Sequence, residues 1–267
     1  MTALTVSFDT TLCRRVLQVT SLAGTTDHVE VQRAVSPYVQ WEDVRGWSTQ
    51  AIASSAVTYY DYEFPEGVAY KYRVLEYNAS GTHTATTEFS VSAVTFDDVW
   101  LKVPAAPFLN RTVIVADKST ITNKSRSALM DVVGRTNPVQ IGGVRSSLSY
   151  TLQLLTLTAA EERDMEYTLS TGDVIFIHLP SNVDLIPGGY FSVGDVTREP
   201  TMRTSSRRVW SLPLATVAAP GSDVIGSAYT IQSVLAEYAT ITDMMADNAT
   251  IADLLARTGT PSEVIVP

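Results

Sequence analysis

The first third of the chain alternates between apolar and polar residues in short runs separated by turn residues. Clear examples are residues 5–8, 29–32 and 70–74. Successive side chains of a strand point to opposite faces of a sheet, so this alternation predicts half-buried strands. Many short strands with little helical pattern between them are typical of a β-sandwich. We therefore expect residues 1–97 to form a β-sandwich domain.

The middle of the chain predicts a second β-rich domain, at residues 98–219. Alternation and composition predict strands at residues 113–115, 139–141, 149–155, 174–177, 190–196 and 209–215. One helix is expected near residues 159–170, because Thr158 and Glu161 have capping-box spacing and Gly172 follows as a stop signal. Pro213 cannot donate to a sheet ladder and should confine the last strand to an edge or an end. The expected architecture is a β-barrel or sandwich with one packed helix.

Residues 220–267 carry a ten-residue unit three times, starting at Thr230, Thr240 and Thr250. In each unit apolar residues stand at positions i, i+3 and i+4, which gives a short helix one apolar face. A ten-residue step rotates that face by about 80° along a continuous helix, so one straight helix would have no common stripe. We expect short, separately capped helices. A bent amphipathic helix lying on the chain's own core is the alternative.

Isolated helices of this length are marginal in water, so their apolar faces should contact a neighbouring protein or another copy of the chain. The expected partner contact comprises nine residues: Ile231, Val234, Leu235, Ile241, Met244, Met245, Ile251, Leu254 and Leu255.

Composition narrows the class of protein. The 267 residues, 45% of them hydrophobic, are sufficient for about two globular domains with real cores. The formal net charge of −9 argues against a nucleic-acid partner. The opening residues show neither a signal peptide nor a membrane span, so assembly in a cytoplasm is expected. Cys13 is the one cysteine, so it should be a small buried hydrophobe and not half of an internal disulfide.

Candidate catalytic side chains are few. The three histidines lie outside any nucleophile motif, and we expect His178 at a strand end and His28 and His83 in solvated loops. The carboxylates of Asp61, Glu63 and Glu66 invite comparison with a glycosidase pair, but solvated side chains beside a loop are commoner.

Asp97 and Asp98 lack the surrounding acidic ladder of a calcium loop, and no Gly-x-Gly-x-x-Gly phosphate motif occurs. The sequence therefore predicts no enzyme, no cofactor and no metal site.

Part of the first domain resembles the second half of a fibronectin type III domain. Phe64 stands six positions before Tyr70, which would close the loop between two strands, and an Asn78-x-x-Gly81 turn follows the next alternating run. The resemblance implies that Trp41 is the core tryptophan of the earlier half.

The order of parts along most of the chain resembles the minor tail proteins of long-tailed bacteriophages that infect actinobacteria. The residues that carry this resemblance are 98–102, 142–146, 158–163, 193–196 and 210–214. The strand–helix–strand order of the middle domain is also similar to the ring-forming split β-barrel of distal tail and tail-tube proteins. The decapeptide repeats depart from distal tail proteins, which leaves the exact position in the tail open.

This resemblance implies a structural virion protein near the tail tip, without enzymatic activity or cofactor. Its partners would be further copies of itself in a ring-like homo-oligomer and other phage tail proteins, with no nucleic acid and no membrane. A carbohydrate- or cell-wall-binding module that contributes to host attachment is the alternative. The aromatic residues that suggest it are Trp47, Tyr59, Tyr60 and Tyr62. About half of the side chains in the run 59–62 should lie in the core, because a strand points them to both faces.

Overall fold

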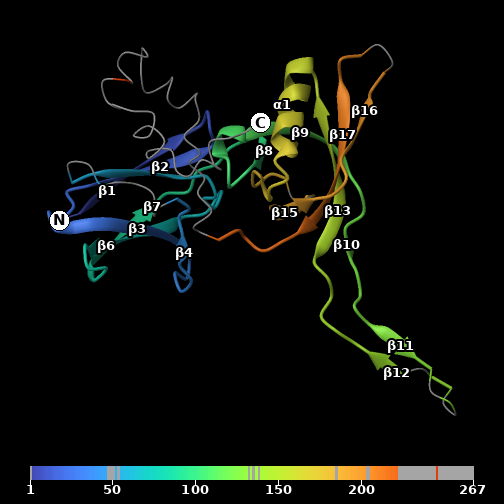
Figure 1. Ribbon diagram of the computed structural model, residues 1–267, viewed down its shortest axis with the longest axis horizontal. Helices are drawn as coiled ribbons and strands as arrows, with labels where there is room; N and C mark the ends of the chain where they lie inside the picture. Colours follow the sequence, from blue (N-terminus) through green and yellow to red (C-terminus); the bar gives the residue numbers. More distant parts are fainter. Residues whose placement is uncertain are drawn as a thin grey trace. The chain divides into compact units, whose positions relative to one another are not determined.

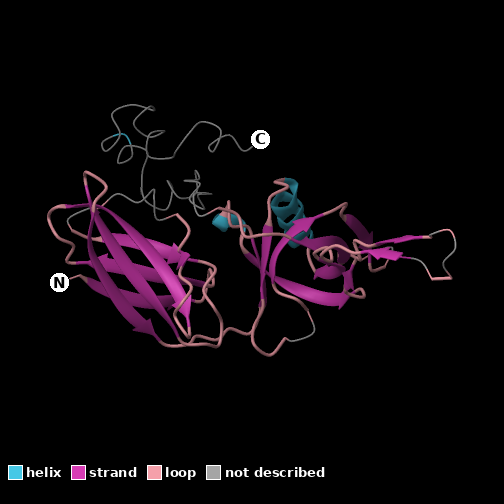
Figure 2. Ribbon diagram, turned by 90° about the horizontal axis from the view of Figure 1, so that it is seen from below, coloured by secondary structure: helices cyan, strands magenta, loops and turns pink. Residues whose placement is uncertain are grey.

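The computed structural model describes residues 2–46, 52, 55–131, 133, 136–137, 139–183, 186–202, 205–221 and 245. Over these residues the protein is mainly β, with 49% in strands and 8% in helices. It divides into two compact units (Figures 1 and 2). The first contains the chain up to Val94 together with Pro104–Asn110, and the second contains Thr95–Val103 and Arg111–Pro220.

The first unit contains a three-stranded and a four-stranded antiparallel sheet. The three-stranded sheet has the order β1-β2-β5, with β1 (Ala3–Asp9), β2 (Arg14–Thr20) and β5 (Val57–Asp61). The four-stranded sheet has the order β4-β3-β6-β7, with β3 (Thr26–Val35), β4 (Glu42–Asp43), β6 (Tyr70–Asn78) and β7 (His83–Val91). A short 3-10 helix, η2 (Pro107–Leu109), also belongs to this unit.

The alternation seen in the sequence matches the burial of these strands. Along β6, Tyr70, Tyr72 and Val74 are buried, whereas the residues between them are only half-buried. The Tyr59 hydroxyl on β5 donates to the Val29 carbonyl on β3 at 2.9 Å, which joins the two sheets through a buried hydrogen bond. Cys13 is buried, as predicted.

The expectation that Trp41 is a core residue is wrong. Trp41 precedes the two-residue strand β4 and is only half-buried. The guanidinium of Arg73, on the outward-facing row of β6, lies 4.3 Å from the centre of its ring. Tyrosines of β5 and β6 and Phe64 provide the large aromatic side chains of this core instead.

Six strands of the second unit close into a barrel in the order β13-β9-β8-β14-β15-β17, because β17 also pairs with β13. Their bounds are β8 (Val99–Lys102), β9 (Arg111–Lys118), β13 (Leu148–Thr156), β14 (Ile175–His178), β15 (Gly189–Val193) and β17 (Arg208–Thr216). Two short strands flank it, β10 (Thr122–Asn123) on β13 and β16 (Thr197–Pro200) on β17.

The prediction of an edge position for the strand that contains Pro213 is wrong, because β17 has neighbours on both sides. Pro213 stands opposite Thr151 of β13. On the other side, the pairing with β16 extends only to Ser211 and that with β15 begins at Leu214. The Pro213 carbonyl accepts from the Gly194 amide on that side, so the N–H that proline lacks falls in the gap between two partners.

The longest helix among the described residues, α1 (Ala159–Ser170), has the predicted bounds. The Thr158 hydroxyl accepts from the Glu161 amide at 3.2 Å, and the Glu161 carboxylate accepts from the Leu157 amide at 2.8 Å. Gly172 takes a positive φ of 69° just beyond the helix, as a C-terminal stop requires. The helix buries Met165 against the second unit.

Replacing Thr158 with alanine should lower the free energy of unfolding by about 1 kcal/mol, because the Glu161 amide loses its capping acceptor. Thr158→Ser keeps the hydroxyl and should retain most of the stability. Chemical denaturation of both variants checks this. Equal stability of the alanine variant and the unchanged chain would show that the cap is dispensable.

Between β9 and β13 the chain leaves the barrel as a long hairpin, residues 119–147, which we call the arm (Figure 1). Its outer part contains β11 (Ala128–Met130) and β12 (Val139–Ile141) as a separate two-stranded sheet. The strand predicted at residues 139–141 therefore forms, but outside the barrel.

Residues 222–267, which we call the C-terminal segment, lie outside the described residues except for Met245. The short helices predicted there, and the partner contact built on them, stay predictions. Among the residues that are described, no helix has the length and apolar character needed to cross a membrane.

Candidate interaction surface

The arm is an antiparallel hairpin whose outer part forms a ladder. Cross-strand partners are Ala128 with Ile141, Leu129 with Gln140, and Met130 with Val139. Nearer the barrel, the Gly143 amide donates to the Arg126 carbonyl at 3.1 Å and the Ser146 amide to the Lys124 carbonyl at 2.9 Å. Backbone pairing thus holds the arm from its base to β11 and β12.

One face of the outer arm is wholly apolar. Directly opposed residues of an antiparallel ladder share a face, and so do residues two apart on a strand. Ala128, Met130, Val139 and Ile141 therefore lie together, and all four are exposed. Met130 is 54% exposed and Ile141 is 57% exposed.

Further large apolar side chains are exposed elsewhere on the described part of the arm. Leu129 lies on the opposite face of β11, and Ile121, Val133 and Val144 are also exposed. A two-stranded hairpin is marginally stable in water by itself, and contiguous exposed apolar groups mark interaction sites. The arm is therefore the strongest candidate for a contact surface in the described residues.

Basic side chains flank the apolar face. Lys124, Arg126 and Arg145 are all exposed on the arm. In the described part of the chain, no ion pair joins any of them to a carboxylate. The surface therefore combines exposed apolar groups with positive charge.

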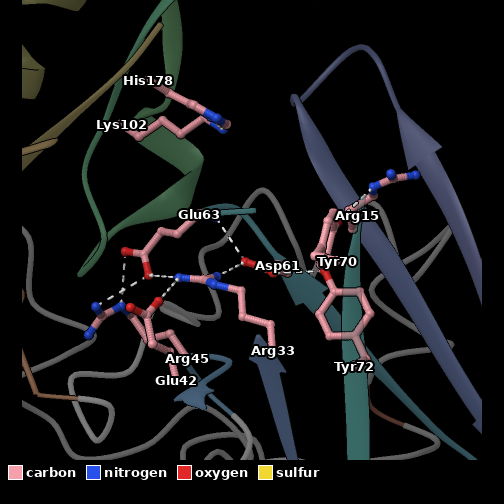
Figure 3. Close-up of polar contacts among 10 residues, drawn as sticks. All are labelled: Arg15, Arg33, Glu42, Arg45, Asp61, Glu63, Tyr70, Tyr72, Lys102 and His178. Carbon is pink, nitrogen blue, oxygen red and sulfur yellow. Dashed lines mark hydrogen bonds and ion pairs between the residues drawn. The ribbon is translucent and has the colours of Figure 1, made fainter. Parts of the chain in front are cut away.

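Two of the three carboxylates expected to be solvated, Asp61 and Glu63, are instead part of a buried charge cluster in the first unit (Figure 3). Asp61 Oδ1 lies 2.5 Å from Arg33 Nη1, and its other oxygen accepts from the Tyr72 hydroxyl at 2.8 Å. Glu63 Oε1 lies 3.2 Å from Arg45 Nε. The expectation is wrong for Asp61 and Glu63 because two arginines neutralise them inside the fold.

Arg33 stays charged in this cluster. Burial lowers the pKa of Arg33, but the facing carboxylates of Asp61 and Glu63 raise it by more, so its pKa lies above the ordinary value. A third arginine, Arg15, donates through Nε to the buried Tyr70 hydroxyl at 3.0 Å. The arginines thus neutralise the buried carboxylates of Asp61 and Glu63 within the first unit.

Glu76 on β6 provides an acid-sensitive contact in the same unit. Its buried carboxylate accepts hydrogen bonds from the hydroxyls of Thr2 and Thr26, the latter at 2.7 Å. Burial raises the pKa of Glu76, but these hydrogen bonds lower it by more than burial raises it. Its pKa therefore lies below the ordinary 4.5.

Because its folded-state pKa is depressed, Glu76 should contribute stability that is complete above pH 4.5 and lost as the pH falls through the folded-state pKa. Glu76→Gln should flatten the acid side of the stability profile. Denaturation midpoints from neutral to acidic pH measure this. An unchanged slope in the variant would contradict the assignment.

The histidines occupy structural positions. His178 ends β14, as predicted, and its Nδ1 lies 2.8 Å from Lys102 Nζ in the buried interior of the second unit (Figure 3). His28 and His83 lie on strands β3 and β7 and not in the expected loops, because the strands extend further than their alternation indicated. His28 stacks on the Tyr77 ring at 4.9 Å, and His83 meets the same ring edge-on.

The residues that suggested glycan binding do not form one aromatic face. Tyr59 is buried, whereas Tyr60 and Tyr62 remain partly exposed beside Arg14, which lies 4.0 Å over the Tyr60 ring. Trp47 lies outside the described residues. The carbohydrate alternative stays a prediction.

No cluster of three or more potential metal ligands occurs among the described residues, and Asp97 and Asp98 are exposed. Comparison of the chain with protein-family models gives no match, and no curated protein matches it.

Proposed function

We propose that this chain is a structural subunit of a bacteriophage tail that associates with further copies of itself in a ring and docks neighbouring tail proteins near the tail tip. The tail-protein motifs in its sequence support this proposal. So does a six-stranded barrel with a packed helix, which matches the architecture expected of a ring-forming tail domain. In the same proposal, the two sheets of the first unit form a sandwich of the fibronectin type III kind.

The observation that carries the proposal is the exposed apolar face of the arm. Four apolar side chains cover it, and the described residues of the chain leave them in water. Covering a large apolar side chain completely contributes about 1.5–3 kcal/mol. A surface of this kind, held on a regular backbone ladder, favours a role in assembly.

The size of the effect indicates what kind of assembly is expected. Met130, Val139 and Ile141 are 54%, 38% and 57% exposed, so covering what remains exposed would contribute roughly 2–4 kcal/mol in all. Association costs about 4–15 kcal/mol in lost freedom of motion, so the apolar face of one arm does not by itself hold two copies together. A closed ring, in which each copy donates one arm and receives another, doubles the contacts of each copy and is therefore the expected form.

Sedimentation velocity of the full chain tests self-association. The proposal predicts species larger than one 29.0 kDa chain, with an amount that rises with concentration. A single monomeric species at every concentration would overturn it.

Mass spectrometry of purified virions tests the location. In a phage that encodes this chain, the protein should remain in particles after extensive washing, at a few copies per tail. Its absence from washed virions would reject the tail assignment even if the protein self-associates.

A further inference from the structure

The arm and the C-terminal segment carry opposite charges. Four basic residues and one aspartate give residues 119–147 a formal net charge of +3. Six acidic residues and one arginine give residues 222–267 a formal net charge of −5, within a chain of net charge −9. The arm is thus a basic element on an acidic protein.

Both elements also carry apolar groups that a partner could cover. The apolar face of β11 and β12 is flanked by Arg126 and Arg145. In the C-terminal segment each repeat has an apolar triplet, and an aspartate occupies the same place in the second and third repeats, at Asp243 and Asp253. Met245, the one described residue of that segment, is 65% exposed.

We infer that the arm of one copy binds the C-terminal segment of a second copy, with the apolar faces in contact and the arginines of the arm beside the aspartates of the repeats. This inference rests on the proposed self-association and names the surfaces that produce it. Opposite charges at the edge of an apolar contact select the partner and its register, and they accelerate the encounter.

The C-terminal segment is long enough for this contact. It starts next to Gly221, whose carbonyl accepts a hydrogen bond from Arg45 of the first unit. From there, 46 residues remain, which cover about 70 Å as helix and up to about 150 Å when extended. A segment of this reach can contact the arm of a neighbouring copy. A contact within one chain would cover the arm without linking copies, and the proposed ring therefore assigns the segment to a second copy.

Two charge-reversed full-length variants test the pairing. The first is Arg126→Glu with Arg145→Glu, and the second is Asp243→Arg with Asp253→Arg. Each alone should weaken self-association by roughly 10- to 100-fold, because like charges then face each other. A matched control, Arg163→Glu with Arg207→Glu, reverses two exposed arginines away from the arm and should leave association unchanged.

An equal mixture of the two variants is the decisive measurement. The glutamates of the first variant's arm then meet the arginines of the second variant's segment, and the other contact is native, so alternating assemblies should regain the affinity of the unchanged chain. Sedimentation velocity on each variant and on the mixture gives the affinities. Circular dichroism of each variant checks that the fold is retained.

The outcomes separate this inference from the proposed function. If the unchanged chain is monomeric, the proposed self-association itself fails. If it assembles but the reversed variants assemble equally well, the pairing of arm and segment is wrong. If each variant fails alone and the mixture stays dissociated, the arm of one copy does not bind the C-terminal segment of another, and the inference is overturned.

Discussion

Replacing Arg33 with methionine should lower the free energy of unfolding of the first unit by about 3–5 kcal/mol, the usual cost of leaving one partner of a buried ion pair alone. Asp61 is only 2% exposed and has Arg33 Nη1 at 2.5 Å. Methionine has nearly the length of arginine but supplies no charge. The Tyr72 hydroxyl would remain as a donor to Asp61, which does not compensate a full buried charge.

Hydrogen exchange at the amides of β6 measures this effect within the first unit alone. A loss of about 3–5 kcal/mol corresponds to an exchange rate on the order of 100- to 1,000-fold higher or more, provided that exchange proceeds through opening of the unit. A change below about 1 kcal/mol, the level of an exposed pair, would contradict the assignment of a buried charge pair.

The double variant Arg33→Met with Asp61→Asn is the matched control. It removes both charges, so it should be more stable than Arg33→Met alone. The loss of Arg33 also removes its longer contact with Glu63, at 3.9 Å, but Glu63 keeps Arg45 at 3.2 Å. If the double variant is as unstable as the sum of the two single variants, the charges of Arg33 and Asp61 do not interact as described.

Replacing Met130 and Ile141 with aspartate should weaken self-association by more than about 100-fold. Both side chains lie on the apolar face of the arm, and covering a carboxylate there would cost several kcal/mol per side chain. Both are exposed in the single chain, so folding should change little. Sedimentation velocity over a range of concentrations gives the affinity.

Val39→Asp is the control for this pair. Val39 is 76% exposed and belongs to the first unit, whereas the arm belongs to the second. It should associate like the unchanged chain. If the arm variant and Val39→Asp associate equally well, the arm is not the contact surface.

Local sequence patterns predicted the elements whose chemistry is itself local. The capping hydroxyl of Thr158 and the positive φ of Gly172 both act within a few residues of the helix that they bound, so α1 could be predicted with its limits. The alternation along β6 likewise depends only on which face of one strand is buried.

The local sequence pattern could not predict the surroundings of residues whose neighbours come from distant parts of the chain. Pro213 is tolerated inside the barrel because two partner strands meet beside it, and no local residue shows that gap. In the sequence, Asp61 and Glu63 look like surface carboxylates. Their partners Arg33 and Arg45 come from other segments of the chain, so only the fold shows the pairing. The position of Trp41 likewise depends on a distant residue, Arg73 of β6, whose guanidinium lies over its ring.

The arm could be predicted only in part. Its strand at Val139–Ile141 follows from β-branched composition, but the same residues would suit a buried strand. Whether residues 139–141 lie inside or outside the barrel depends on where β13 stops pairing with β9 and β10, because the chain beyond that point forms the arm. The basic character of residues 119–147 within an acidic chain was the available signal.

The proposed assembly requires another copy to cover the arm, and thiol labelling of Ala128→Cys measures this directly. Ala128 lies on the apolar face opposite Ile141, and the natural Cys13 is buried, so the new thiol should dominate the reaction. As concentration rises and copies associate, the labelling rate should fall in proportion to the remaining fraction of free chains. A rate that is the same in assembled and dissociated protein would contradict the account.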